Sequence, residues 1–365
     1  MFNKAMFKFQ FKTLTPLLAA LLFGAQVLVI NPVSAQTPTE AGTVAFQSGD
    51  YALALKEWTA MAEKGDHNAQ FNLGILLMSD KAGPKNEKAA MEWFTKAANG
   101  GNARAQFNLG EAYRLGVGVD KDMNQAVEWY KKSAEQGLPI AQLTLGVMAE
   151  NGEGLPKDYA QAAKWYQLAS DHQLGQANSR LARMHALGLG TEVNMRLAGI
   201  YATYAARQNF APAQTYLATL HMTGEGVAKD DKQALYWLVT AAKQGNARAF
   251  AWLGKIYRDG IGVPADLLRS YIYYSIANRI DTEQDLQGSA GRDTLVLAIR
   301  MKPEEIQQAT QLANDWKPGS YPPKFDASLM KQDDKPVTVK ETAQTKEKEA
   351  AKEKPAEKPK APVKK

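Results

Sequence analysis

The stretch from Gly101 to Gly137, GNARAQFNLGEAYRLGVGVDKDMNQAVEWYKKSAEQG, combines a glycine-rich loop, clustered acids and adjacent aromatic residues. A catalytic or ligand-binding loop of that composition is expected once in a chain. Here the spacing returns several times, because a leucine recurs every 36 residues. The leucines are Leu73, Leu109, Leu145, Leu181, Leu217 and Leu253. Self-similarity at a fixed period marks repeat architectures, so this stretch is one unit of a repeat.

The first part of each unit predicts a helix that touches a neighbouring helix closely. An alanine stands four residues before each leucine, as Ala105 stands before Leu109. A glycine or a second alanine follows each leucine directly, as Gly110 does. Small residues beside one large apolar residue allow the two helices to approach each other closely.

The second part of each unit predicts another helix, marked by an aromatic residue. The aromatic positions are Trp93, Trp129, Trp165, Tyr201, Trp237 and Tyr273. Small residues lie three places before and four places after most of them, as Ala126 and Ser133 do around Trp129. Residues three and four apart share one face of a helix, so each unit is a helical hairpin with its aromatic residue in the core.

The loops between these helices repeat as well. Gly116 and Gly118 suit a left-handed helix C-cap, and Asp122 suits the N-cap of the next helix. Their counterparts lie 36, 72, 108 and 144 residues further on. The loop lacks the glycine spacings that cradle phosphates. Gln125 and Lys131 stand where a calcium loop needs Gly and Glu, so we predict no catalytic, cofactor-binding or metal-binding residue there.

These units resemble the Sel1-like repeat family, the longer-period relatives of tetratricopeptide repeats. The pattern A-x-x-x-L-G-x-x-Y-x-x-G-x-G-V-x-x-D-x-x-x-A-x-x-W-Y-x-x-A-A-x-x-G is nearly complete from Ala105 to Gly137. The resemblance covers about residues 41–280, although Leu, Ala or His replaces the family tyrosine in four units. It implies an all-α fold, a right-handed superhelical solenoid of helix-turn-helix repeats whose first helices line the concave surface. It also implies a protein-binding scaffold.

The chain divides into four predicted segments. Residues 1–35 form a signal peptide, and residues 36–280 form the solenoid, with about six full repeats after an N-terminal hairpin. Residues 281–318 form capping helices, one beginning at Pro303, that cover the last repeat. Residues 319–365 form a disordered tail rich in Lys, Glu, Pro and Ala.

The N-terminal segment predicts export. Three lysines precede an apolar run over residues 17–30, and Val33 and Ala35 fit the two small-residue positions of a signal-peptidase site. We expect cleavage between Ala35 and Gln36, a periplasmic protein and no membrane span after cleavage. The alternative is an uncleaved anchor, although the run is shorter than the ~20 residues of a spanning helix.

Charge and cysteine content exclude several function classes. The net charge of +6 arises at the two ends, since residues 36–330 carry a net charge of about −1 and residues 331–365 carry +4. The body therefore offers no basic surface for nucleic acid. The chain has no cysteine, which excludes disulfides and thiolate chemistry.

Candidate binding residues lie on the first helix of each unit, two and five places on either side of the repeated leucine. These positions vary between units and face away from the packed stripe. They include Phe71, Ile75, Met78, Phe107, Glu111, Arg114, Ile140, Leu143, Val147, Arg183, Arg248, Lys255 and Arg258. An apolar stretch with a basic end suits a peptide or extended protein segment. Phe71 and Phe107 have an alternative role as packed family-consensus residues.

The sequence thus predicts an exported, periplasmic, non-enzymatic scaffold that binds envelope proteins or peptide segments through its concave surface. Replacing Phe107, Leu143 and Val147 together with charged residues is expected to abolish partner binding without unfolding the solenoid. One alternative is a protein that binds cell wall or another exported glycan. The other is an envelope hydrolase, although the cysteines of the family's cysteine-rich branch and an S-x-x-K pairing are missing.

Overall fold

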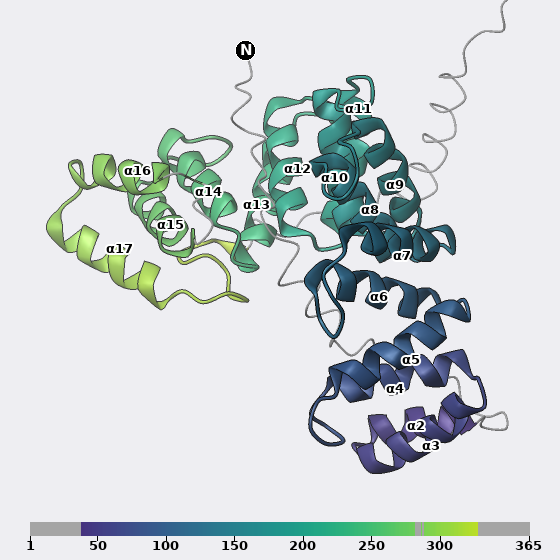
Figure 1. Cartoon of the computed structure of the whole chain (residues 1–365). Helices are drawn as coiled ribbons and strands as arrows, with labels where there is room; N and C mark the ends of the chain where they lie inside the picture. The colour runs from purple at the N-terminus through teal and green to yellow at the C-terminus, as the bar shows by residue number, and fades with distance from the viewer. Residues whose placement is uncertain (1–37, 282–285, 287, 328–365) are drawn as a thin grey trace, which may run out of the picture.

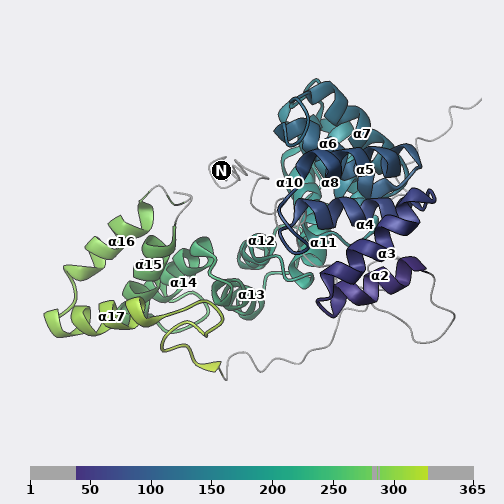
Figure 2. The ribbon, with the colours of Figure 1, turned by 60° about the horizontal axis from the view of Figure 1, so that its bottom comes forward.

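The computed structural model describes residues 38–281, 286 and 288–327, and this part of the chain holds sixteen α-helices and no strand. Successive helices pair into hairpins that stack along a curved path (Figures 1 and 2). The all-α repeat fold predicted from the sequence is confirmed. The predicted signal peptide and the part of the predicted tail from residue 328 onward lie outside the described residues.

The hairpins keep the predicted period. An N-terminal hairpin, α2 (Pro38–Gln47) and α3 (Tyr51–Glu63), precedes six repeats. The repeats are α4 (His67–Met78) with α5 (Glu87–Asn99), α6 (Ala103–Leu115) with α7 (Met123–Glu135), α8 (Pro139–Asn151) with α9 (Tyr159–Asp171), α10 (Gly175–Leu187) with α11 (Met195–Arg207), α12 (Ala211–Thr223) with α13 (Asp231–Lys243), and α14 (Ala247–Asp259) with α15 (Leu267–Ile280). Two further helices, α16 (Ser289–Ala298) and α17 (Pro303–Asp315), follow.

The core lies between the two helices of each hairpin and between successive hairpins. All six repeated leucines are buried, as predicted. In the first three repeats the deepest aromatic position is one residue later than predicted: Phe94, Tyr130 and Tyr166 are at most 2% exposed, while the tryptophans before them are half-buried. In the fourth and sixth repeats the predicted residues Tyr201 and Tyr273 are themselves buried. Trp58 of α3 stands 36 residues before Phe94, so this tryptophan occupies the deep position directly.

A glycine on the first helix makes room for each deep aromatic ring. A Cβ atom added to Gly74 would lie 2.6 Å from Phe94, and one added to Gly146 would lie 2.5 Å from Tyr166. Gly110 and Gly254 face Tyr130 and Tyr274 in the same way. The two repeats with alanine here, Ala182 and Ala218, have the smaller Ala202 and Leu238 at the ring position. The small residue after each leucine therefore depends on the size of its partner on the second helix.

Helix ends follow the predicted loop chemistry. Gly116 takes the left-handed conformation at the end of α6, with φ of 74°, and its backbone N–H donates to the Ala112 carbonyl. Asp122 accepts hydrogen bonds from two backbone N–H groups at the start of α7. Asp158, Asn194, Asp230 and Asp266 cap their helices in the same way. Each such cap contributes about 1 kcal/mol to stability.

A ladder of buried amides joins neighbouring hairpins. Gln106 of α6 donates through Nε2 to the carbonyl of Ala98 at the end of α5, over 3.0 Å, and accepts from Gln136 over 2.6 Å. The equivalent residues Gln70, Gln142 and Gln214 also donate to the end of the preceding helix. These bonds give carbonyl groups of the last helical turn a second donor beside a backbone N–H, and they join one repeat to the next.

The C-terminal segment caps the stack and extends beyond its predicted end. Ala290, Leu297, Ala309 and other buried residues of α16 and α17 share one apolar cluster with α14 and α15, as a cap requires. The predicted start of the tail at residue 319 is wrong, because residues 319–327 pack back on the last repeats. The hydroxyl of Tyr273 donates to the Pro323 carbonyl over 2.9 Å, and the backbone N–H of Gly319 donates to the Lys243 carbonyl over 2.7 Å.

Candidate protein-binding face and N-terminal cleft

The middle of the predicted concave surface is closed. In α8 ten consecutive residues, Ala141 to Glu150, are buried, whereas its partner α9 buries four. Phe107 is 5% exposed, Leu143 1% and Val147 3%. Leu143 and Val147 share an apolar cluster with Leu181 of the next repeat. The prediction that these three residues form an accessible surface is wrong. Replacing them with charged residues would place charges in the core and unfold the chain.

Buried acids on this face bind arginines and tyrosines of the chain itself. Glu111 is 1% exposed, so its predicted place on an open surface is also wrong. Its carboxylate accepts from both Nε and a terminal nitrogen of Arg114, over 3.2 and 2.6 Å, and from the hydroxyl of Tyr130. Arg114 is thus held in place by the protein, and little of its charge remains for a partner.

Glu150 occupies the same role one repeat later and joins two repeats. It accepts from the hydroxyl of Tyr166 over 2.6 Å, from Arg180 over 2.9 Å and from Arg183. Arg180 and Arg183 stand on α10, so the acid of one repeat pairs with the cations of the next. Partial burial lowers the pKa of Arg183 from its ordinary value. Sequence reasoning identified Arg183 but missed Glu150, although it lies five places after Leu145, and Arg180, which lies one place before Leu181.

The basic residues predicted at the end of the binding surface also interact with groups of the chain itself. Arg258 pairs with Asp259 over 2.7 Å and with Asp293 of α16 over 3.0 Å, which ties the last repeat to its cap. The ammonium of Lys255 lies 5.0 Å from the ring centre of Trp252. Arg248 is half-buried on α14, near its start.

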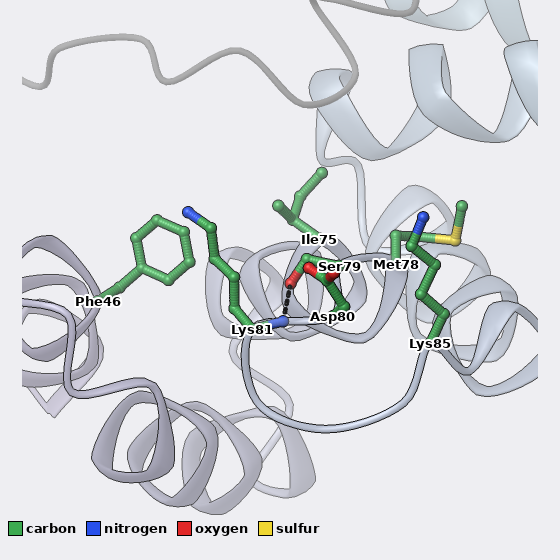
Figure 3. Close-up of a pocket in the computed structure, with 7 residues that line it drawn as sticks. All are labelled: Phe46, Ile75, Met78, Ser79, Asp80, Lys81 and Lys85. Carbon is green, nitrogen blue, oxygen red and sulfur yellow. Dashed lines mark hydrogen bonds between the residues drawn. The ribbon is translucent and has the colours of Figure 1, made fainter.

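The apolar residues of the first repeat border an open cleft. Phe46, Ile75, Met78, Ser79, Asp80, Lys81 and Lys85 line about 260 Å³ between α2, the end of α4 and the loop that follows it (Figure 3). Ile75 and Met78 were predicted at this face. Phe71 is half-buried and packs on Phe94 instead, with ring centres 5.9 Å apart. Ile140 is half-buried against the clusters around α8.

The lysine at the cleft is positioned by aromatic rings of the N-terminal hairpin. The ammonium of Lys81 lies 4.8 Å from the ring centre of Phe46 and 5.0 Å from that of Tyr51. In Figure 3 the side chain of Lys81 extends toward Phe46, and that of Lys85 rises beside Met78. Two cationic groups therefore flank an apolar floor. No sequence pattern marked Phe46 or Lys81 as binding residues, since neither lies on the repeated positions.

Because several tyrosines are buried, we expect the protein to lose stability sharply at alkaline pH. Burial raises the pKa of Tyr130, Tyr166 and Tyr273 above the ordinary value, and for Tyr130 the nearby Glu111 carboxylate adds to the effect. These phenols stay protonated in the folded chain at a pH where unfolded tyrosines ionise. Their contribution is therefore complete below about pH 10 and is lost as pH rises further, by up to about 1.4 kcal/mol per pH unit for each tyrosine.

Far-UV circular dichroism and tyrosinate absorbance, recorded together from neutral to alkaline pH, check this expectation. The buried tyrosines should ionise only together with loss of helix. Ionisation of all tyrosines in a chain that keeps its full helical signal would contradict it.

Comparison with known proteins fits this geometry. The Sel1 repeat family matches residues 67–102, 103–138, 139–174, 175–210, 211–246 and 247–279. A Sel1 repeat protein from Oxalobacter formigenes is 32% identical in sequence, and the match covers 67% of this chain and all of that one, with a TM-score of 0.60. The protective antigen c5321 of uropathogenic Escherichia coli strains, which displays an SLR fold, is 20% identical over 90% of this chain and 88% of its own, with a TM-score of 0.42. No curated protein matches the sequence.

Within the described ranges no helix is both long and apolar enough to cross a membrane. The six matched segments coincide with the six helical hairpins from α4 to α15 and span more than half of the chain. The chain therefore belongs to the Sel1 repeat family, whose repeats generally mediate protein–protein interactions.

Proposed function

We propose that this protein is an exported, periplasmic scaffold without enzymatic activity that binds another protein of the cell envelope. The observation that carries the proposal is the open cleft at the first repeat, where Ile75 and Met78 form an apolar floor beside Lys81 and Lys85. Further along the same face, Glu111 and Glu150 hold the arginines near them in internal ion pairs. A rigid stack of this kind lowers the ordering cost of binding, because the site is formed before the partner arrives.

Export is the first part of the proposal to test. We expect N-terminal mass spectrometry of the protein purified from whole cells to find Gln36 as the first residue. Ala35→Arg should leave the longer precursor, because the position before the cleavage site accepts only small side chains. Thr39→Arg, four residues further on, is the matched control and should still yield a chain beginning at Gln36. Wild-type protein recovered with residues 1–35 intact, or found in the cytoplasmic fraction, would refute cleavage and export respectively.

Protein binding is tested by photo-crosslinking in living cells. A photoreactive amino acid replaces Met78 on α4 or Lys255 on α14, and in a matched control it replaces the exposed Lys164 on the second helix α9. We expect the two first-helix positions to crosslink to the same envelope protein and the control position to yield none. Crosslinks from Lys164 alone would move the binding surface to the second helices. Crosslinks to glycan in place of protein would support the polysaccharide-binding alternative.

A further inference from the structure

The N-terminal cleft exists because the first repeat departs from the loop geometry of the others. Helix α4 ends at Met78, one residue earlier in the repeat than α6, α8, α10, α12 and α14. Its C-cap is Ser79 in an extended conformation, where the later repeats have a left-handed glycine. The Ser79 hydroxyl donates to the Leu76 carbonyl over 2.7 Å at this helix end. Asp80 and Ala82 replace the two loop glycines.

This departure brings to the cleft a cation that the later repeats lack at the same place. At the position of Lys81 the later repeats carry Val117, Glu153, Leu189, Glu225 and Ile261. Lys81 contacts the faces of Phe46 and Tyr51, so its ammonium is oriented at the edge of the apolar floor. Lys85, on the other side, has counterparts in Lys121, Lys157 and Lys229. The pair of lysines around an apolar floor is thus a property of the first repeat.

The dimensions and charge of the cleft define what it can hold. Its volume of about 260 Å³ lies below that of most sites for drug-sized ligands, which begin near roughly 300 Å³, and suits one large side chain with its adjoining backbone. Phe46, Ile75 and Met78 offer apolar contact to that side chain. Two lysines and the single carboxylate of Asp80 line the cleft, so its lining carries a net positive charge. This charge attracts carboxylates on either side of the bound side chain.

We propose that the N-terminal cleft binds an extended acidic segment of a partner protein, seating one aliphatic side chain between Phe46 and Met78 while Lys81 and Lys85 pair with flanking carboxylates. This rests on the proposed function as a protein-binding scaffold. The chain's own C-terminal residues 331–365 are a poor occupant, because their net charge of +4 has the same sign as the cleft. An isolated exposed ion pair contributes little, so the apolar contact and the two cations act together.

Fluorescence anisotropy with synthetic peptides tests the proposal. The probe is a fluorescein-labelled decapeptide with one central leucine between glutamates, and the protein is the chain from Gln36 to its end. Two reference peptides replace the leucine with serine or every glutamate with glutamine. We expect saturable binding of the first peptide that weakens at higher salt, and binding at least tenfold weaker for each reference peptide.

Matched variants assign the binding to the cleft. Lys81→Glu with Lys85→Glu should weaken binding of the glutamate–leucine peptide at least tenfold. Lys121→Glu with Lys157→Glu changes the net charge equally, in loops of the next two repeats, and should leave affinity within twofold of wild type. Met78→Ser should weaken binding with both lysines in place, and circular dichroism verifies that each variant is folded.

Three results would overturn the proposal: no saturable binding of the glutamate–leucine peptide, equal loss from the two charge-reversal pairs, or undiminished binding of the glutamine peptide. None of them bears on the crosslinks from Lys255. If the protein crosslinks to an envelope protein from Lys255 but binds no acidic peptide, the scaffold function stands and only the role proposed for the cleft is refuted.

Discussion

Replacing Glu150 with glutamine is expected to lower the free energy of unfolding by about 3 kcal/mol, the largest effect of any single substitution considered for this chain. The carboxylate is 7% exposed and lies between Arg180 and Arg183, whose side chains are 12% and 17% exposed. Glutamine keeps the shape of the side chain but removes its charge. Two partly buried guanidinium groups would then lose the carboxylate that they share, and Tyr166 would donate to a weaker acceptor.

Thermal unfolding followed by circular dichroism measures the effect, which should appear as a decrease in Tm of about 6–10 °C. Glu153→Gln is the matched control, because Glu153 is exposed three residues further along, and its Tm should stay within about a degree of wild type. Replacing the whole group, as Glu150→Leu with Arg180→Met and Arg183→Met, should recover most of the lost stability, since no charge is left unpaired. A Glu150→Gln protein as stable as wild type would show that water already screens the two arginines.

Gly74→Ala is expected to destabilise the protein by about 2 kcal/mol, although helix propensity alone favours alanine by about 1 kcal/mol. The added Cβ would lie 2.6 Å from one Phe94 ring atom and 2.7 Å from a second, closer than packed carbon atoms approach. Phe94 is 2% exposed, so its ring has no open space into which to move. The steric cost should therefore exceed the gain in propensity, and the Tm should fall.

Another repeat of the chain indicates which second substitution should restore the stability of this variant. In the fifth repeat the equivalent pair is Ala218 with Leu238, so Phe94→Leu should make Gly74→Ala tolerable. The double variant should be more stable than Gly74→Ala alone, and the two substitutions should be strongly non-additive in a double-mutant cycle. Additive effects, or a rise in Tm for Gly74→Ala alone, would contradict the proposed fit between the glycine and the ring.

The elements that depend on local chemistry and on regular spacing were predictable from the residues alone. The period of the repeated leucines, the left-handed glycine at Gly116 and the capping oxygen of Asp122 all depend on residues within one repeat. These signals can be recognised in one repeat alone, and the repetition multiplies them. The fold and the family were therefore predictable from the residues alone.

Which residues of the first helices are accessible depends on how the hairpins pack against one another. Phe107, Leu143 and Val147 stand at the positions that sequence spacing assigned to an open surface, yet all three are buried. Phe107 packs on Tyr130 of its own hairpin, whereas Leu143 and Val147 share a cluster with the next repeat. The same holds for Glu150, whose arginines come from the next repeat, and for the cleft, in which Phe46 of the N-terminal hairpin meets Lys81. These contacts join separate hairpins, so their geometry is fixed only when the hairpins pack.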